Sequence, residues 1–227
     1  MITAIILDLD DTLFMTQATA CEMERAAAVA VGLPPVDPDI HRRTWGMGIA
    51  EALPLRLPGV DPSHYPAFIA AHADQIKRYV AEDKLDQLSQ ANIAALSQLQ
   101  SAGYQLYALT SRHHGEVVHL LGNTHPLNQF VAAEALYYRD RLTHHKPDPK
   151  VFTVFFRETG LSPTECVYVG DSPTDCQAAK GAGLGFICCL ESGLRNRADF
   201  ETLQPPPDHY IDTFADIPAL FAAVIRL

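Results

Sequence analysis

The sequence predicts an α/β protein, namely a doubly wound, Rossmann-like parallel sheet with a small α-helical cap inserted after the first strand. An apolar run, Thr3 to Leu7, stops abruptly at a cluster of aspartates, as is typical of a strand that is buried on both faces. From residue 85 onward, apolar strands alternate with helices, which indicates a parallel sheet covered on both faces. Between Leu13 and Tyr104 no strand pattern occurs, so this stretch is predicted to be a helical insertion.

The inserted cap domain is predicted at residues 15–84. Ala-rich residues 15–31 predict a helix that ends at Gly32, because glycine is the common residue just past a helix end. A second helix is predicted at residues 38–53, with an interruption near Gly46–Gly48, and a third at residues 65–81. The residues that punctuate the intervening loop are Pro54, Pro58, Gly59 and Pro62.

The core domain is predicted at residues 1–14 and 85–227. Its strands after the first are expected at residues 104–109, 130–132, 166–169, 184–188 and 210–211. Its helices are expected at about residues 86–101, 113–121, 148–159, 174–182 and 217–226. Residues 191–208, which are rich in charge and proline, predict a loop or a short helix.

Composition excludes several classes of partner. The chain has 227 residues, of which 48% are hydrophobic, and a net charge of −10. It can therefore bury a full core, but it has no basic run that would contact a nucleic acid or an anionic membrane. No apolar stretch reaches membrane-spanning length, and the N-terminus lacks the features of a signal peptide. The five scattered cysteines favour reduced thiols, so we expect a cytoplasmic protein. We also expect a monomer or a homodimer.

The end of the first strand carries two carboxylates, Asp8 and Asp10. Residues two apart on a strand project to one side, and two such carboxylates repel each other unless a cation or a shared proton relieves them. Mg2+ suits this arrangement, because it binds one or two carboxylates together with phosphate oxygens. A solvated acidic turn is the alternative, and this stretch alone leaves both interpretations open.

Other polar residues follow the later strands, and strand ends of a doubly wound sheet meet at one crevice. Thr110 and Ser111 follow the strand at 104–109, and Asp171 follows the strand at 166–169. The remaining members of the set are Asp175 at a helix start and Lys146 in a proline-containing loop. Carboxylates for a metal, with a hydroxyl and an ammonium for an anion, fit phosphoryl chemistry.

Each of these residues also has a simpler explanation. Thr110 could cap the helix that follows it, and Lys146 could be a solvated surface lysine. Asp175 could be an ordinary residue of a helix N-terminus. For Asp11, a turn residue is the preferred interpretation.

Taken together, the motifs resemble those of the haloacid dehalogenase-like hydrolase superfamily. The matching segments, in the order of that superfamily, are Asp8-Leu9-Asp10-Asp11-Thr12-Leu13, Leu109-Thr110-Ser111, Lys146-Pro147 and Gly170-Asp171-Ser172-Pro173-Thr174-Asp175. The insertion after the first motif is similar to the helical cap of the phosphoglycolate phosphatase and β-phosphoglucomutase branch. The resemblance spans about residues 3–190.

The resemblance implies a role for each matching residue. Asp8 would be the nucleophile that forms an aspartyl-phosphate, and Asp10 the general acid and then the general base. Asp8, Asp171 and the backbone carbonyl of Asp10 would hold Mg2+, with Asp175 as a further ligand or as a residue that orients the ligands. The residues that would bind and neutralise the transferring phosphoryl group are Thr110, Lys146 and the backbone near Ser111.

The function that follows is a Mg2+-dependent phosphatase acting on a small phosphorylated metabolite of the phosphoglycolate or sugar phosphate type. Its cap would close to exclude water and contact the substrate. Dehalogenases and phosphonate hydrolases of the superfamily lack the second aspartate of the first motif, so Asp10 argues against both activities. A sugar-phosphate mutase keeps both aspartates and stays open as an alternative, as does a non-catalytic phosphate-binding module.

Overall fold

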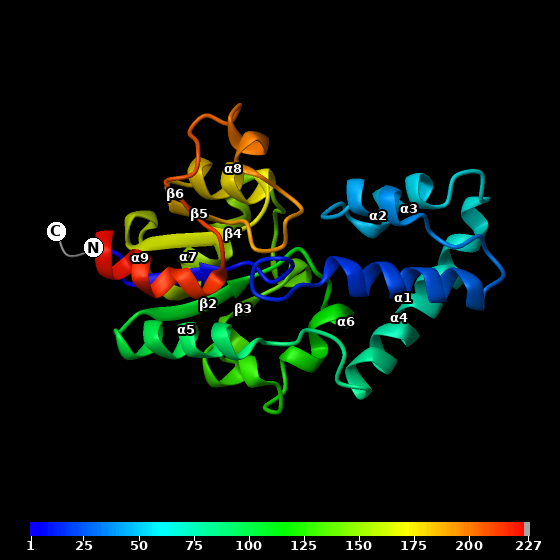
Figure 1. The fold of residues 1–227 in the computed structure, drawn as a ribbon, viewed down its shortest axis with the longest axis horizontal. Coiled ribbons are helices and arrows are strands. Elements are labelled where there is room, and N and C mark those ends of the chain that lie inside the picture. Colours follow the sequence, from blue (N-terminus) through cyan, green and yellow to red (C-terminus); the bar gives the residue numbers. More distant parts are fainter. Residues whose placement is uncertain (225–227) are drawn as a thin grey trace. The chain divides into compact units, whose positions relative to one another are not determined.

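A computed structural model describes residues 1–224 of the chain (Figure 1). These residues form two compact units, one made of Met1–Phe14 with the chain from Leu88 onward, and the other made of Met15–Gln87. The expected domain boundary at residue 85 lies three residues before Leu88. That the second unit works as a cap stays a prediction.

The first unit is built on one six-stranded sheet in which every pair of neighbours is parallel. The strand order is β3-β2-β1-β4-β5-β6, so the first strand of the chain lies in the middle. The strands are β1 (Ala4–Leu7), β2 (Gln105–Leu109), β3 (Leu136–Tyr137), β4 (Cys166–Gly170), β5 (Gly185–Cys189) and β6 (His209–Ile211). This topology confirms the predicted doubly wound α/β class.

Helices cover both faces of this sheet (Figure 1). The helices of the first unit are α5 (Gln90–Ser101), α6 (His114–Val117), α7 (Thr153–Thr159), α8 (Pro173–Gly181) and α9 (Ile217–Val224). Helices α5 and α9 pack on one face, and α7 and α8 on the other. The last helix was expected to reach residue 226, but residues 225 and 226 lie outside the described part of the chain.

The sequence of β1 is apolar without interruption because the strand is buried on both faces. Ile5 and Leu7 belong to the core cluster under α5 and α9, whereas Ala4 and Ile6 belong to the cluster under α7 and α8. All four side chains are fully buried. Burying a large aliphatic side chain contributes roughly 1.5–3 kcal/mol, so both faces of the central strand anchor the sheet.

The strand expected at residues 130–132 is wrong. A 3-10 turn, Pro126–Gln129, ends just before it, and the outer strand of the sheet is β3 instead. Val131 is 1% exposed and packs in the core cluster under α5. These residues are apolar because a loop buries them, and a short apolar run does not distinguish that from a strand.

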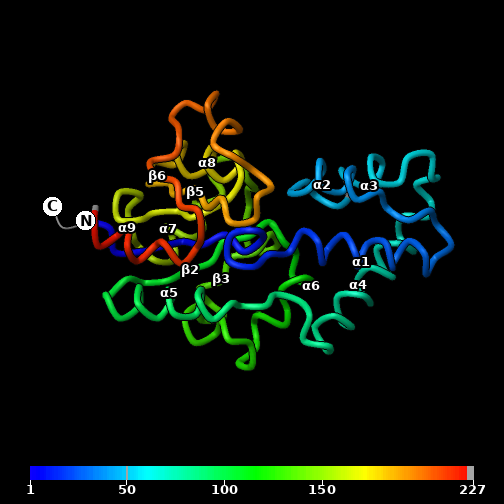
Figure 2. The backbone as a smooth tube through the Cα atoms, viewed as in Figure 1, coloured from blue at the N-terminus to red at the C-terminus, as the bar shows by residue number. Residues whose placement is uncertain are grey.

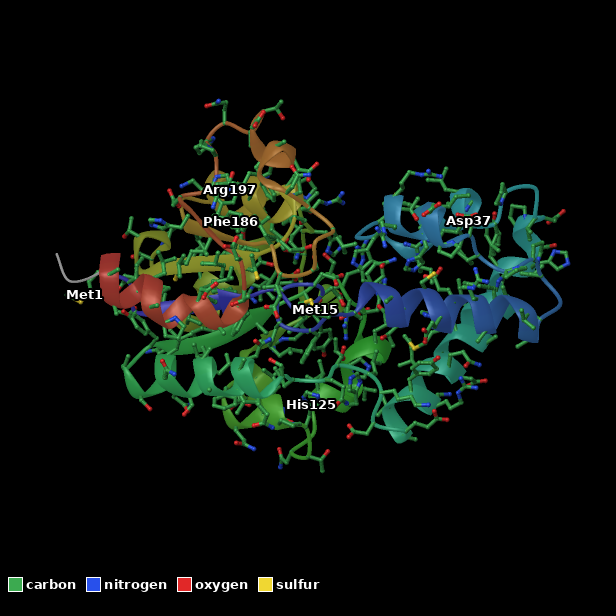
Figure 3. The ribbon with its side chains drawn as sticks, viewed as in Figure 1. Met1, Met15, Asp37, His125, Phe186 and Arg197 are labelled. Carbon is green, nitrogen blue, oxygen red and sulfur yellow. The ribbon has the colours of Figure 1, made fainter. Side chains whose placement is uncertain are left out.

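The second unit contains the helices α1 (Gln17–Ala30), α2 (Pro38–Arg43), α3 (Ile49–Arg56) and α4 (Tyr65–Ala81). Asp37, labelled in Figure 3, begins α2, because its Oδ1 accepts hydrogen bonds from the backbone N–H groups of Asp39 and Ile40. Phe68 of α4 packs against Ala27 and Ala28 of α1. Within residues 1–224 no helix is both long and apolar enough to cross a membrane.

Pro54 was expected in a loop, but it lies inside α3. A proline within a helix removes one backbone hydrogen bond. Leu53 and Leu57 on either side are almost completely buried in the core of this unit. Burial of these two side chains offsets the lost hydrogen bond, which is why the helix continues to Arg56.

A buried ion pair joins the helices of the second unit. Glu24 of α1 accepts a short hydrogen bond from Arg56 Nη1, and both side chains are 4% exposed. Arg56 also donates to Thr44 through Nε, at 2.8 Å, and through Nη2. His41 Nε2 lies 3.5 Å from the same Glu24 oxygen. These contacts satisfy charges that would otherwise be costly to bury.

Candidate active site

The chain makes a tight turn directly after β1, at the carboxyl edge of the sheet (Figure 2). Asp8 continues the strand, since its N–H donates to the carbonyl of Val169 on β4 at 2.9 Å. The chain then turns back at Asp11, which has a positive φ of 56°. The backbone N–H of Phe14 closes the turn on the carbonyl of Leu9 at 2.9 Å. Asp11 is therefore a turn residue, which confirms the prediction from the sequence.

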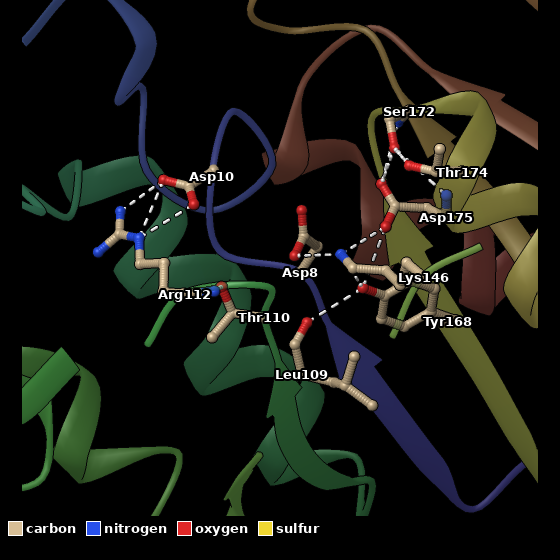
Figure 4. Close-up of polar contacts among 10 residues, drawn as sticks. All are labelled: Asp8, Asp10, Leu109, Thr110, Arg112, Lys146, Tyr168, Ser172, Thr174 and Asp175. Atoms are coloured by element: carbon tan, nitrogen blue, oxygen red, sulfur yellow. Dashed lines mark hydrogen bonds and ion pairs between the residues drawn. The ribbon is translucent and has the colours of Figure 1, made fainter. Parts of the chain in front are cut away.

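Lys146 lies between two carboxylates (Figure 4). Its Nζ is 2.9 Å from Asp8 Oδ1 and 2.6 Å from Asp175 Oδ1. The Lys146 side chain is only 7% exposed, so it is not a solvated surface lysine. Charge-assisted hydrogen bonds of this length fix both the ammonium and the Asp8 carboxylate.

Asp171 completes a group of three buried carboxylates. One oxygen from each of Asp8, Asp171 and Asp175 lies within 4.8 Å of the others. Asp171 is 7% exposed, and within the described residues its carboxylate has no hydrogen bond or ion pair. A buried carboxylate without a partner is costly. This donor set fits a hard divalent cation such as Mg2+, which prefers oxygen ligands.

The pKa values of the site also reflect an excess of negative charge. Burial raises the pKa of Asp8 from 3.8 to about 7, although Lys146 opposes this and Asp175 and Asp10 add to it. Burial, together with the charges of Asp175 and Asp8, also raises the pKa of Asp171 well above its ordinary value. Burial lowers the pKa of Lys146, but Asp175 and Asp8 outweigh it and leave the pKa well above its ordinary value. The site therefore holds more negative charge than one lysine balances.

Asp175 has every carboxylate oxygen engaged. Its Oδ2 accepts hydrogen bonds from the backbone N–H of Ser172 at 3.1 Å and from the Ser172 hydroxyl at 2.6 Å, which forms the capping box of α8. Its Oδ1 accepts from Lys146 at 2.6 Å and lies 3.3 Å from the Tyr168 hydroxyl oxygen. Asp175 is thus a helix-capping residue and also a residue of the site, and its contacts favour orienting Lys146.

Thr110 and Ser111, at the end of β2, are placed differently from each other. Thr110 is fully buried, and its hydroxyl accepts a hydrogen bond from the backbone N–H of Arg112 at 3.3 Å. Ser111 is exposed, and within residues 1–224 its side chain makes no hydrogen bond. Thr110 therefore fixes the backbone of the loop at Arg112. The exposed hydroxyl of Ser111 is available to a ligand.

Asp10 faces away from the lysine, toward Arg112 (Figure 4). Arg112 Nη2 donates to Asp10 Oδ1 at 2.5 Å, and Arg112 Nε lies 3.1 Å from Oδ1 and 3.0 Å from Oδ2. The Arg112 and Asp10 side chains are 8% and 23% exposed. The two aspartates of the first motif thus have different partners, as different chemical roles require.

Sequence reasoning missed two residues of this site, Arg112 and Tyr168. The Tyr168 hydroxyl donates to the carbonyl of Leu109 at 3.0 Å and accepts from Lys146 Nζ at 3.0 Å. A tyrosine inside a fully buried strand must find a partner for its hydroxyl, and this was the available signal. For Arg112 the signal was its position two residues after Thr110.

The fold and the site together define a doubly wound α/β protein with a cluster of buried carboxylates at the carboxyl edge of its sheet. The family follows from the sequence comparison. The family model of haloacid dehalogenase-like hydrolases matches residues 5–189, and the chain belongs to this family. The resemblance drawn from its motifs is thereby confirmed.

Characterised relatives place the chain in the phosphoglycolate phosphatase-like branch. It is 28% identical to phosphoglycolate phosphatase of Rhodobacter capsulatus over 201 aligned residues. These residues make up 88% of this chain and 89% of the relative. It is 26% identical to a phosphorylated carbohydrates phosphatase of Thermotoga maritima over 200 aligned residues. These residues make up 84% of this chain and 88% of the relative.

Solved structures share the fold. The structure of CbbY from Rhodobacter sphaeroides in complex with phosphate matches with a TM-score of 0.77 at 24% identity, over 96% of each chain. A phosphoglycolate phosphatase-like structure from Lactobacillus plantarum matches with a TM-score of 0.76 at 23% identity, over 97% of this chain and 99% of the other. At these identities the likeness concerns the architecture alone.

Proposed function

We propose that this enzyme is a Mg2+-dependent phosphatase that hydrolyses a small phosphomonoester of the phosphoglycolate or sugar phosphate type. The observation that carries the proposal is the position of Lys146 between Asp8 and Asp175, beside the unpaired carboxylate of Asp171. The names of the relatives, which act on phosphoglycolate and on phosphorylated carbohydrates, support the substrate class.

Asp8 is the proposed nucleophile. Lys146 fixes its Oδ1 at 2.9 Å, which leaves Oδ2 to attack phosphorus and form an aspartyl-phosphate. Covalent catalysis of this kind divides hydrolysis into two displacements. The Lys146 ammonium and the backbone amides after Thr110 would offset the negative charge of the transferring phosphoryl group. Ser111, which is exposed, contributes to phosphate binding in this proposal.

Asp10 is the proposed general acid and base. It donates a proton to the leaving alcohol in the first displacement and accepts one from water in the second. It is the more exposed of the two aspartates, at 23% against 7%, so substrate and water can reach it. General acid–base catalysis of this kind contributes about 10²–10⁴-fold to the rate.

Asp8 and Asp171 would hold Mg2+, together with the backbone carbonyl of Asp10. Asp175 is proposed as a further member of this metal site or as the residue that orients Lys146, and its hydrogen bonds with Lys146 and Ser172 support the second role. When bound, Mg2+ would neutralise charge on the phosphoryl oxygens. We further propose that residues 15–84 form a cap domain and that the enzyme works in the cytoplasm as a monomer or homodimer.

Phosphate release from a panel of small phosphate esters tests this function. We expect release by the native protein with Mg2+, none with EDTA, and a loss of at least about 10³-fold in Asp8→Asn, because removing a covalent nucleophile has effects of this size or larger. Lys150→Met, a change at an exposed lysine after the same loop, is the matched control and should keep full activity. Release that survives Asp8→Asn would overturn the nucleophile assignment.

Two other results would redirect the proposal. Isomerisation of a sugar phosphate that depends on a bisphosphate primer, without net phosphate release, would identify a mutase. Binding of Mg2+ and inorganic phosphate without turnover of any ester would identify a binding module.

A further inference from the structure

Arg112, in the loop after β2, donates hydrogen bonds to the Asp10 carboxylate. The Arg112 backbone is fixed on both sides, because its N–H donates to Thr110 Oγ1 at 3.3 Å and its carbonyl accepts from the N–H of Arg139 at 2.9 Å. Its guanidinium is buried, with only 8% of the side chain exposed. Such an arginine has little freedom to move away from its partner.

The contact between the two side chains is not symmetric. Asp10 Oδ1 accepts from Arg112 Nη2 at 2.5 Å. The single hydrogen of Arg112 Nε is shared between the two oxygens, at 3.1 Å from Oδ1 and 3.0 Å from Oδ2. Oδ1 is therefore held by the shorter hydrogen bond, and Oδ2 keeps capacity for another partner.

We propose that Arg112 is a positioning residue, which fixes the Asp10 carboxylate through Oδ1 so that Oδ2 is the oxygen that exchanges protons with the substrate and with water. This inference rests on the proposed phosphatase function and names a residue that controls its acid–base step. A planar guanidinium suits this task, because it sets the plane of a carboxylate as well as its position.

Each displacement moves one proton between Asp10 and an oxygen bound to phosphorus. In the first displacement, Asp8 bonds to phosphorus, the bond from phosphorus to the alcohol oxygen breaks, and the proton on Asp10 Oδ2 moves to that oxygen. In the second, water bonds to phosphorus and gives a proton to Asp10 Oδ2, while the bond from phosphorus to Asp8 breaks. Phosphate leaves, and both aspartates return to their starting states.

Esters with different leaving groups separate this role from a structural one. An alkyl ester such as glycerol 2-phosphate needs a proton on its leaving oxygen, whereas p-nitrophenyl phosphate releases a stable anion. We expect Arg112→Ala to lower kcat on the alkyl ester by about 10²-fold, the cost of misplacing a catalytic group by about 1 Å, and to affect the aryl ester far less. Added guanidinium ion should restore part of the alkyl activity.

A double-mutant cycle tests whether Arg112 acts through Asp10. Asp10→Asn alone should show the same selective loss on the alkyl ester, and adding Arg112→Ala should then cause no further selective loss, because residues that act as one unit are not additive. Arg141→Ala breaks another arginine–carboxylate pair, with Glu158 at 3.0 Å. It serves as the matched control and should leave the ratio of the two activities unchanged.

The outcomes are distinguishable. Equal losses on both esters, or additive losses in the double variant, overturn the positioning role and leave the phosphatase function intact. If the native protein hydrolyses no ester of the panel, or hydrolyses them without Asp8, the proposed function fails and this inference fails with it. Should Arg112→Ala not fold, Arg112→Lys keeps the charge without the planar fork, and a selective loss on the alkyl ester is expected there too.

Discussion

Gly170 and Asp175 lie so close together that a Cβ atom at position 170 would fall 2.7 Å from Asp175 Cγ. Gly170 ends β4 and Asp175 caps α8. The absence of a side chain at position 170 lets the Asp175 carboxylate reach Lys146 over the end of the sheet. A glycine, rather than a charged residue, thus sets the position of the lysine that holds Asp8.

Gly170→Ala is expected to displace Asp175 and loosen Lys146. Phosphate release should fall by about 10²-fold, as for other misplacements of about 1 Å, and the free energy of unfolding should fall by about 1–3 kcal/mol. Steady-state kinetics and chemical denaturation measure these effects. Gly115→Ala is the control, because a Cβ there meets nothing within 4 Å. Unchanged activity in Gly170→Ala would show that the Asp175 position is not critical.

Asp171→Asn is expected to have opposite effects on the metal-free and metal-loaded protein. Without metal, the change removes an unpartnered buried charge and should raise the free energy of unfolding, since such charges are costly. With Mg2+, the native protein should gain stability through binding and the variant should gain much less. Thermal melts with EDTA measure the stability without metal, and melts with rising Mg2+ measure the stability that binding adds. Exposed Asp212→Asn is the control, and a variant that responds to Mg2+ like the native protein would contradict the assignment.

Tyr168→Phe is expected to cost about 1–3 kcal/mol of stability, because it leaves the buried carbonyl of Leu109 without a hydrogen bond that it accepts. Activity should fall modestly, since Lys146 keeps its two carboxylate partners. Tyr107→Phe on β2 removes a hydroxyl whose one hydrogen bond within residues 1–224 goes to the Gln105 side chain, at 2.7 Å, so it should cost much less. Urea denaturation of the two variants compares the costs, and equal values would argue against the role of Tyr168.

Acid is expected to destabilise the second unit through Glu24. Burial raises its pKa, but the contact with His41 and the charge of Arg56 outweigh this and leave the pKa below its ordinary value of 4.5. Below pH 4.5 the unfolded chain therefore binds a proton before the folded one does, so stability is present above that pH and falls as the pH drops. Denaturation at pH 3.5–6 should show this slope, and Glu24→Gln should flatten it. An identical slope in the variant would contradict the assignment.

Much of the candidate site could be predicted because its residues follow strand ends. Once a parallel sheet is expected, its topology alone brings Asp8, Asp171 and Lys146 to one edge, and the structure places them there. The aspartates are also short and lie close to the backbone, so their positions depend little on side-chain conformation. The particular roles of these residues remain predictions.

Arg112 and Tyr168 could not be found in the same way, because both reach the site through long side chains. An arginine after a strand is most often solvated, and only the fold shows that Asp10 lies within its reach. The failed strand at residues 130–132 has a related cause. Its apolar residues are buried, but burial alone does not decide whether a backbone pairs with a neighbouring strand.

The central position of β1 has a consequence for how the molecule folds. Ala4 lies beside Gln105 on one side and Cys166 on the other, so both partners of β1 lie about a hundred or more residues later in the chain. Contacts between residues so far apart in sequence form slowly, because a long loop must close before they contribute. Asp8 sits at the end of that strand, and Asp171 and Asp175 follow β4, so the carboxylate cluster becomes complete only when β4 has paired with β1.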